Sequence, residues 1–324
     1  MYLNNNTKME ILQDKNKKNK INDWKGKKER NMRLAQLYQN LYKMTGNSEY
    51  KKWANKIGMC ALQLVFQSEN ETGDNKKLYQ MYTCKNKFCP ICQWRRSKKI
   101  GYQINKIIEW LDINKKGCEY IFGTLTLKNC SARELKNTID KIYVAMKRFK
   151  NDRSIKMAYK GLFRALEITF NKKSKMYHPH IHFIAVVHSG AYFDHSNKNY
   201  ISQKKLCEIW KRCLDLDYIP LCSLEKIKQK YKAVCEVAKY SVKSKDILDE
   251  TILDTLDSVL YKRRLYSYTG WFKEAYQKMR LDKNENDLVH IENEKEKVSV
   301  GSWLLTYKWS IGLKNYVLVD RTQK

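Results

Sequence analysis

Two histidines, His180 and His182, stand two residues apart in the segment His178-Pro-His-Ile-His182. Residues i and i+2 of a β-strand point to the same face, so both imidazoles could bind one metal ion while Ile181 points into the core. An isolated pair of this spacing is common, and a structural pair satisfied by hydrogen bonds is the plainer interpretation. The metal interpretation gains weight because four of the six histidines lie within residues 178–188.

A carboxylate can be placed opposite these histidines if the chain folds into a hairpin. Residues 163–170 and 177–187 are rich in apolar and β-branched side chains, and a lysine-rich turn separates them. If residues 171–176 form the turn, position 170 faces 177, and Glu167 then faces His180 at about 5 Å. The expected metal ligands are therefore Glu167, His180 and His182, in a register that a slip of one residue would destroy.

A tyrosine with neighbouring ionisable groups is the third candidate for chemistry. Glu236, Tyr240 and Lys243 are spaced to share one face of a helix expected over residues 223–243. At about 100° per residue this face lies almost opposite the apolar stripe of the same helix. That stripe is formed by Leu224, Ile227, Tyr231, Val234 and Ala238. Tyr240 could therefore be a nucleophile, although a solvated tyrosine beside an ion pair is the commoner outcome.

Cysteines supply a second metal motif, Cys84-x4-Cys89-Pro-Ile-Cys92. Two thiolates two residues apart can turn back onto one tetrahedral ion, and Zn²⁺ prefers four such ligands. Cys60 is the most plausible fourth ligand, which predicts a structural zinc site. Buried free cysteines or a redox pair are the alternatives. A basic run follows at once and suits contact with phosphates, through Arg95, Arg96, Lys98 and Lys99.

The composition points to a polyanionic partner. Lys and Arg number 64 against 34 Asp and Glu, which gives the 324-residue chain a formal charge of +30. Nucleic acid is the first candidate and an anionic membrane surface the second. No uncharged apolar run approaches the roughly 20 residues that span a bilayer, and residues 1–10 are too polar for a signal peptide. The ten cysteines, three of them close together and most of the others scattered singly, favour reduced thiols in a cytoplasm over a secreted disulfide scaffold.

The periodicity of the remaining sequence supplies the elements that hold these groups. Strands separated by helices and by one tight hairpin predict an α+β fold, in which helices pack on a central antiparallel sheet. Ser131-Ala-Arg-Glu134 matches a capping box and should open a helix. The other expected helices cover residues 31–58, 93–111 and 203–214. The other expected strands cover residues 60–66 and 120–127, with a terminal hairpin over residues 303–319. The charged region 245–298 is expected to be mostly helical or loop.

Four parts of the chain are expected from these patterns. Residues 1–23 should form a basic mobile tail, and residues 24–112 a helical and zinc-binding region. Residues 113–250 should form the core with the central sheet, the histidine pair and Tyr240. Residues 251–324 should form a basic, helical region that ends in the hairpin.

The order of the motifs resembles the plasmid rolling-circle replication initiators, the Rep proteins of the HUH endonuclease superfamily. The resemblance covers residues 24 to 319 and rests on five segments. These are the cysteine-rich stretch 84–98 with Cys60, the strand Phe122-Gly-Thr-Leu-Thr-Leu127, the metal segment 164–182, the helix segment 236–246, and Arg263-Arg-Leu-Tyr-Ser-Tyr-Thr-Gly270. Gly123 departs from the family pattern. The resemblance implies an HUH-type nuclease of the single-tyrosine class.

The resemblance also implies a mechanism. Tyr240 would attack a DNA phosphate at the double-strand origin and form a 5′-phosphotyrosyl bond, leaving a 3′-OH that primes synthesis. Lys243 would stabilise the phenolate, and Glu236 would activate water for the terminating cleavage. The imidazoles favour Mn²⁺, with Mg²⁺ as the alternative, beside the separate structural zinc. No G-x-x-x-x-G-K-[ST] loop is present, so a host helicase is implied.

Two other classes of protein stay open at this point. A related HUH transposase or relaxase would share the site, although relaxases usually add a third histidine from a motif that this chain lacks. A non-enzymatic zinc-knuckle DNA-binding regulator would leave Glu167 and Tyr240 unexplained. The expected partners are origin DNA, single-stranded or in a hairpin, and the host replication machinery, with no membrane; a dimer stays open. Arg263 and Arg264 are further candidates for DNA contact.

Overall fold

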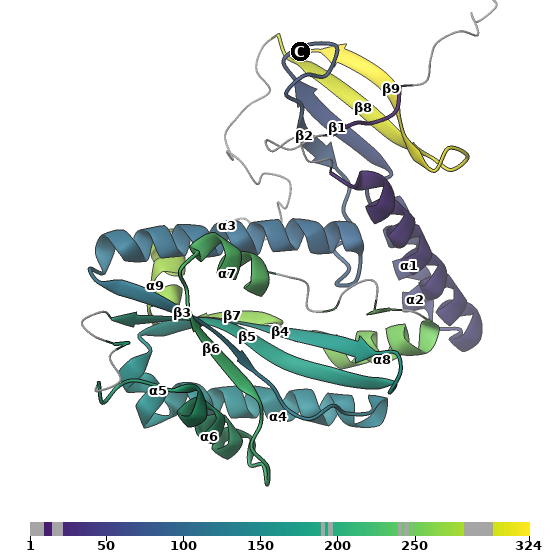
Figure 1. Cartoon of the computed structure of the whole chain (residues 1–324). Helices are drawn as coiled ribbons and strands as arrows, with labels where there is room; N and C mark the ends of the chain where they lie inside the picture. Colours follow the sequence, from purple (N-terminus) through teal and green to yellow (C-terminus); the bar gives the residue numbers. More distant parts are fainter. Residues whose placement is uncertain are drawn as a thin grey trace, which may run out of the picture. The chain divides into compact units, whose positions relative to one another are not determined.

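The computed structural model describes residues 10–14, 22–188, 192–193, 197–238, 242, 246–247, 249–281 and 301–324. The chain divides into two compact units, Met1–Arg96 with Asn286–Lys324, and Ser97–Glu285. Each unit carries its own antiparallel sheet with helices (Figure 1). The α+β class is therefore confirmed, but there are two sheets where one was expected. The predicted four-part division of the chain stays a prediction.

The first unit combines two helices with a four-stranded sheet in the order β2-β1-β8-β9. Helices α1 (Trp24–Thr45) and α2 (Ser48–Met59) replace the single helical region expected over residues 31–58. The chain turns between them at Gly46, whose φ of +69° is left-handed and ends α1. The strands are β1 (Gln63–Ser68), β2 (Lys77–Met81), β8 (Trp303–Ser310) and β9 (Asn315–Gln323).

The terminal hairpin forms as expected, and one of its strands pairs with a strand from near the start of the chain. Strand β8 pairs with β9 on one side and with β1 on the other, where Leu64 faces Tyr307. Ile11 forms a bridge to Val317, and the carboxylate of Asp14 accepts a hydrogen bond from the indole of Trp24. Residues 11 and 14 are thus held in the same unit as the C-terminal strand β9.

The second unit is built on a five-stranded antiparallel sheet in the order β6-β3-β5-β4-β7. Its long central strands, β4 (Gly161–Asn171) and β5 (Met176–His188), form the expected hairpin. Asn171 caps the turn by accepting hydrogen bonds from the amides of Lys173 and Ser174. The other strands are β3 (Cys118–Leu125), β6 (Cys222–Lys226) and β7 (Tyr266–Thr269).

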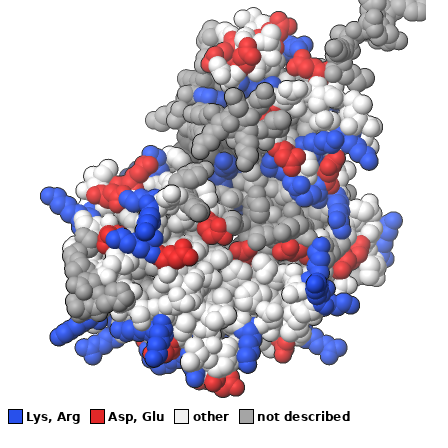
Figure 2. Space-filling model, in the orientation of Figure 1, with Lys and Arg blue, Asp and Glu red and all other residues white. Residues whose placement is uncertain are grey.

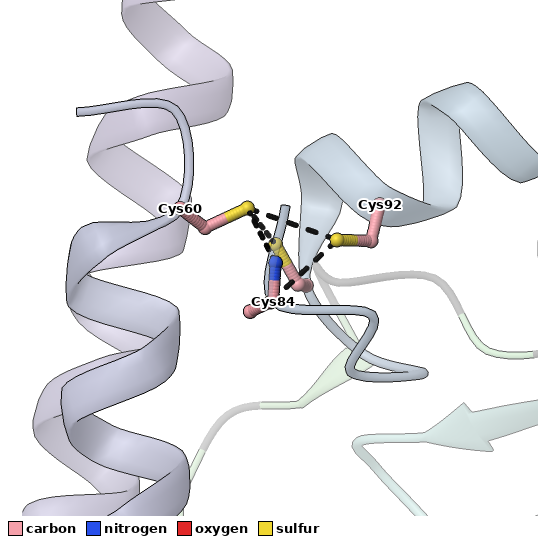
Figure 3. Close-up of side chains that lie close together, drawn as sticks. Cys60, Cys84 and Cys92 are labelled. Carbon is pink, nitrogen blue, oxygen red and sulfur yellow. Dashed lines mark hydrogen bonds between the residues drawn. The ribbon is translucent and has the colours of Figure 1, made fainter. Parts of the chain in front are cut away.

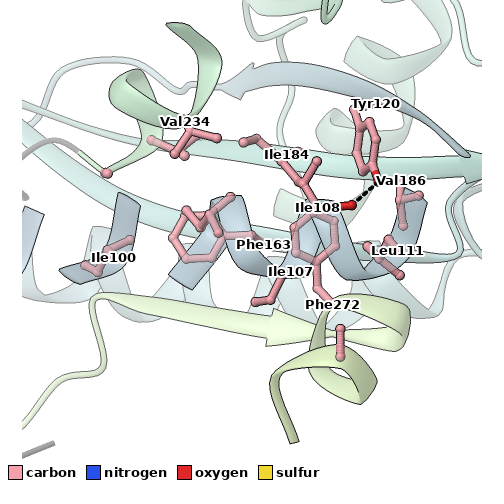
Figure 4. Packing of buried hydrophobic residues seen from close by; sticks show 14 residues of the cluster. Ile100, Ile107, Ile108, Leu111, Tyr120, Phe163, Ile184, Val186, Val234 and Phe272 are labelled. Carbon is pink, nitrogen blue, oxygen red and sulfur yellow. Dashed lines mark hydrogen bonds between the residues drawn. The ribbon is translucent and has the colours of Figure 1, made fainter. Parts of the chain in front are cut away.

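Helices cover both faces of this sheet (Figure 1). Ile184 and Val186 of β5 pack with buried side chains of α3 (Pro90–Asn114), α7 (Lys230–Val237) and α9 (Gly270–Lys278) (Figure 4). The opposite face packs on α4 (Ala132–Asn151) and α6 (Gln203–Leu214), where Phe149 contacts Phe183 and Trp210. The capping box of α4 is present at Ser131 and Glu134. Short helix α5 (Arg153–Ala158) and helix α8 (Glu250–Leu260) complete the described elements.

One predicted helix is wrong over much of its length. The helix expected over residues 223–243 does not begin there, because residues 222–226 form the edge strand β6. Leu224 pairs with Gly123 of β3, so ladder hydrogen bonds override the apparent helical spacing. Helix α7 begins only at Lys230 and ends at Val237. Strands β2 and β7 were not expected.

Candidate metal groups and their surroundings

The predicted register of the β4–β5 hairpin is confirmed. Phe170 faces Tyr177, and Glu167 faces His180. His182 follows on the same face of β5, because alternate residues of a strand point to the same side. The three side chains that the sequence brought together as a metal group therefore do converge on one face of the sheet.

The ligand atoms of this group lie close enough to hold one ion. Nε2 of His182 lies 3.1 Å from Oε2 of Glu167 and 3.2 Å from Nε2 of His180. Nε2 of His180 lies 3.6 Å from the same carboxylate oxygen. Glu167 and His180 are buried and His182 is partly exposed. Two imidazoles and one carboxylate suit a divalent transition ion such as Mn²⁺ better than they suit Mg²⁺, because Mg²⁺ prefers ligands that are all oxygen atoms.

Hydrogen bonds orient both imidazoles toward the shared centre. Nδ1 of His180 lies 3.1 Å from the backbone oxygen of His178, and a carbonyl oxygen can only accept. Nδ1 of His180 therefore carries the proton, which leaves the lone pair of Nε2 directed at the centre. Nδ1 of His182 lies 3.0 Å from the hydroxyl of Thr124, and the ring of Phe122 stacks on His182 with centroids 5.6 Å apart.

The structure leaves no space for a side chain at position 123, where Gly123 departs from the family pattern. It pairs with Phe183, the residue that follows His182, and points to the opposite face of the sheet. A Cβ at position 123 would lie 2.3 Å from the ring of Phe183, closer than any real contact. The glycine therefore makes room for Phe183, which packs on Phe149 of α4 beneath the metal group.

The segment that carries the candidate nucleophile is only partly described. Glu236 lies on α7. Val234 and Val237 of this helix, and Ala238 directly after it, pack in the same cluster as Ile184. Ile184 shares its sheet face with His180 and His182, so α7 lies on the metal side of the sheet. Tyr240 and Lys243 lie outside the described residues. Their described neighbours Ala238 and Val242 are only 3% and 2% exposed.

Four cysteines of the first unit form a second group that could hold a metal, from Cys60, Cys84, Cys89 and Cys92. Sγ of Cys60 lies 3.7 Å from the sulfurs of Cys89 and Cys92, and Sγ of Cys84 lies 3.5 Å from that of Cys92. Bonds of about 2.3 Å to a tetrahedral ion place sulfurs about 3.8 Å apart. The spacing therefore fits one ion such as Zn²⁺, and the cysteine group predicted from sequence is brought together, Cys60 included.

Three parts of the chain contribute these thiols. Cys60 follows the last residue of α2, Cys84 lies in the loop after β2, and Cys92 lies in the first turn of α3 (Figure 3). All four cysteines are buried. The amide of Cys84 donates to Sγ of Cys60, and Lys85 adopts a left-handed φ of +60° as the loop turns back. The loop is thus shaped to return the chain to the same centre.

Two residues beside the cysteines were missed from the sequence. Lys28 is completely buried, and its ammonium contacts Asn31 and two backbone carbonyls. Burial lowers the pKa of Lys28 to about 8, against the charges of neighbouring cysteines. Asn31 donates to Sγ of Cys89. The signal that could have found them is their spacing, because both occupy the apolar stripe of α1 between Trp24 and Leu34.

The basic residues predicted to contact DNA fall into different environments. Arg95 is 1% exposed, which does not favour a contact with DNA, and Arg96 donates to the backbone oxygen of Lys85. Lys98 is exposed and Lys99 partly exposed. On the face shown in Figure 2, Lys and Arg are scattered among acidic groups. The view shows no single basic patch.

Arg263 and Arg264 also lie in different environments. Arg263 pairs with Asp140 and lies over the ring of Tyr143, both on α4. Arg264 is exposed. Strand β7 pairs Tyr266 with Ala165, and the amide of Leu166 donates to the oxygen of Leu265. Arg264 precedes this strand, and its backbone oxygen accepts a hydrogen bond from the hydroxyl of Tyr143 on α4.

No helix in the described part of the chain combines the length and the apolar character needed to cross a bilayer.

A family model and curated relatives both identify this chain as similar to replication proteins. Residues 75–317 match the family model Rep_1, described as a replication protein. A "Protein rep" of Bacillus amyloliquefaciens is 37% identical, over 95% of this chain and 97% of its own length. Proteins of the same name from Streptococcus pneumoniae serotype 2 and Lactiplantibacillus plantarum are 33% and 31% identical. Those two alignments cover 96% and 95% of this chain, and 96% and 99% of the relatives. No solved structure matches significantly.

Proposed function

Since the chain belongs to the replication protein family Rep_1 and is a plasmid Rep initiator, we propose that it starts rolling-circle replication by nicking and religating one DNA strand. The nick would be made at the double-strand origin through a 5′-phosphotyrosine intermediate. The HUH-type fold, the metal dependence and the single-tyrosine chemistry are parts of this proposal.

The observation that carries the proposal is the convergence of Glu167, His180 and His182 at the centre of one sheet face. Both imidazoles have their Nδ1 atoms at hydrogen-bonding distance from oxygen atoms, so their Nε2 atoms are oriented before anything binds. The buried carboxylate of Glu167, 3.1 Å from Nε2 of His182, adds the anionic ligand that a divalent ion would need beside the two imidazoles. A divalent ion held there would polarise a DNA phosphate as a Lewis acid.

Tyr240 is the proposed nucleophile. Its oxygen would form a bond to phosphorus as the bond from phosphorus to the 3′ oxygen breaks, and the departing 3′ oxygen would take up the proton. Because one phosphodiester replaces another, the step requires no ATP. A free tyrosine has a pKa near 10, so the phenolate needs a nearby positive charge, which we assign to Lys243. In support, α7 lies on the metal side of the sheet and Ala238, two residues before Tyr240, is buried there.

Glu236 is the proposed base for the closing step. At the terminating cleavage, water would lose a proton to this carboxylate and attack the origin phosphate, which breaks the bond from phosphorus to the 3′ oxygen. The 3′-OH set free would attack the phosphotyrosine, which rejoins the strand and returns the tyrosine. Glu236 is partly exposed on α7.

The proposed partner is origin DNA, single-stranded or in a hairpin. A formal charge of +30 supports a polyanionic ligand, with contacts that displace counterions and weaken as salt rises. Arg264 and Lys98 are the exposed candidates for phosphate contact. Unwinding would be supplied by a host helicase, because the sequence contains no P-loop.

A nicking assay tests the metal site. Supercoiled plasmid that carries the DNA flanking the gene for this chain should be converted to open circles in Mn²⁺. Glu167→Gln should lower the rate at least about 100-fold, since even outer-shell partners of metal ligands are worth 10–100-fold. Glu225→Gln, on the edge strand of the same sheet, is the matched control and should nick at the wild-type rate. Equal rates for the two variants would refute the assignment of Glu167.

A further inference from the structure

The cysteine group of the first unit poses a charge problem. Four thiolates and one divalent ion carry a net charge of −2, and the four cysteines are at most 5% exposed. A buried charge is costly unless an opposite charge or hydrogen bonds accompany it. The surroundings of the sulfurs should therefore contain a compensating group.

Lys28 of α1 is such a group. It is 0% exposed, and its Nζ lies 3.1 Å from Oδ1 of Asn31, 2.7 Å from the oxygen of Gly58 and 2.8 Å from the oxygen of Cys60. All three neighbours can only accept a hydrogen bond. An ammonium has three protons to donate, one for each acceptor, so the geometry is that of the charged form. The positive charge is thus held beside the residue that carries the first thiol.

Asn31 connects this ammonium to a second thiol. Its Oδ1 accepts from Lys28, which fixes the orientation of the amide, because lysine offers donors only. Its Nδ2 then points to Sγ of Cys89 at 3.3 Å. An N–H group directed at a sulfur favours the thiolate over the thiol.

We propose that Lys28 and Asn31 form the charge-compensating outer shell of the cysteine site, and that they set how tightly it holds a thiophilic divalent ion such as Zn²⁺. Lys28 offsets one of the two excess negative charges, and Asn31 donates a hydrogen bond to the Cys89 thiolate. The inference rests on the proposed zinc at this site. It does not depend on the nicking chemistry.

A purely structural role for Lys28 is the competing explanation. Its contacts with the oxygens of Gly58 and Cys60 also satisfy carbonyls at the C-terminal end of α2, as basic side chains at helix ends often do. In that case the loss of Lys28 would lower the stability of the fold. It would leave the affinity of the folded protein for zinc unchanged.

Two variants of the full-length protein separate the explanations. Lys28→Gln keeps donors for the carbonyls but removes the charge, and we expect zinc affinity to fall about 10-fold, as for other outer-shell partners. Asn31→Asp keeps the shape but replaces the N–H donor by an oxygen beside Cys89, and the loss should be larger than for Asn31→Leu. Lys52→Gln, an exposed lysine of α2, is the control. Zinc transfer to a chromogenic chelator gives the affinity, and circular dichroism checks folding.

The outcomes fall into three cases. Weaker zinc binding by Lys28→Gln and Asn31→Asp, with faster alkylation of the cysteines by iodoacetamide, supports the inference. Zinc affinity equal to that of the wild type in both folded variants overturns the inference. If Lys28→Gln does not fold, the comparison of zinc affinity between Asn31→Asp and Asn31→Leu decides alone. A wild-type protein that carries no zinc overturns both the zinc site and the inference, whatever the nicking assay shows.

Discussion

The hydroxyl of Thr124 lies 3.0 Å from Nδ1 of His182, on the side of the ring that faces away from Glu167. Thr124 and His182 are direct partners across β3 and β5, so the contact is built into the register of the sheet. The strand motif Phe122-Gly-Thr-Leu-Thr-Leu127 thereby joins the metal group. The same strand supplies the ring of Phe122 that stacks on His182.

Removal of this hydroxyl should weaken metal binding without unfolding the protein. Thr124→Val keeps the shape of the side chain but leaves Nδ1 of His182 without its oxygen partner, and the Mn²⁺ concentration for half-maximal nicking should rise about 10-fold. Thr126→Val is the control, because the Thr126 hydroxyl donates to the backbone oxygen of Leu221. An unchanged Mn²⁺ requirement in Thr124→Val would show that the hydroxyl does not orient the imidazole.

The close approach of Gly123 and Phe183 predicts a steric effect on stability. Gly123→Ala places a methyl group against the Phe183 ring, and overpacking of this kind costs about 1–3 kcal/mol of unfolding free energy. Phe183→Leu should be destabilising alone but should make room for the added methyl group, so the double variant should lose less than the sum of the two single losses. Urea unfolding of the four proteins measures this coupling. Additive losses would mean that the ring does not limit position 123.

The hairpin and its metal group could be predicted because their determinants are local. Alternating side chains and a turn of known length fix which residue faces Glu167, and the structure agrees at every pair from Phe170 to Glu167. The helix expected from 223 failed because Leu224 gains a partner, Gly123, that lies far away in the sequence. Lys28 escaped notice because a lysine on a helix is usually solvated. Its burial depends on carbonyls of α2 and the loop that follows it.

The neighbouring arginines Arg263 and Arg264 should have different functions. Arg264→Ala should weaken binding to single-stranded DNA. It should also reduce the slope of log affinity against log salt concentration by about one, the change expected for the loss of one phosphate contact. Arg263→Ala should leave that slope unchanged and lower the unfolding free energy, because Arg263 pairs with Asp140 and lies over Tyr143. Fluorescence anisotropy across a salt series, with urea unfolding of each variant, measures both effects. The same change of slope in both variants would contradict the division.

The most direct test of the account is whether Tyr240 becomes covalently joined to DNA. Single-stranded oligonucleotides that tile the sequence next to the gene for this chain, labelled at the 3′ end, would be incubated with the protein and Mn²⁺ and separated under denaturing conditions. The account predicts a labelled protein adduct through a 5′ phosphate. The adduct should be absent from Tyr240→Phe and retained by Tyr261→Phe, a variant at an exposed tyrosine. A wild-type protein that forms no adduct, or a Tyr240→Phe variant that still forms one, would contradict the account.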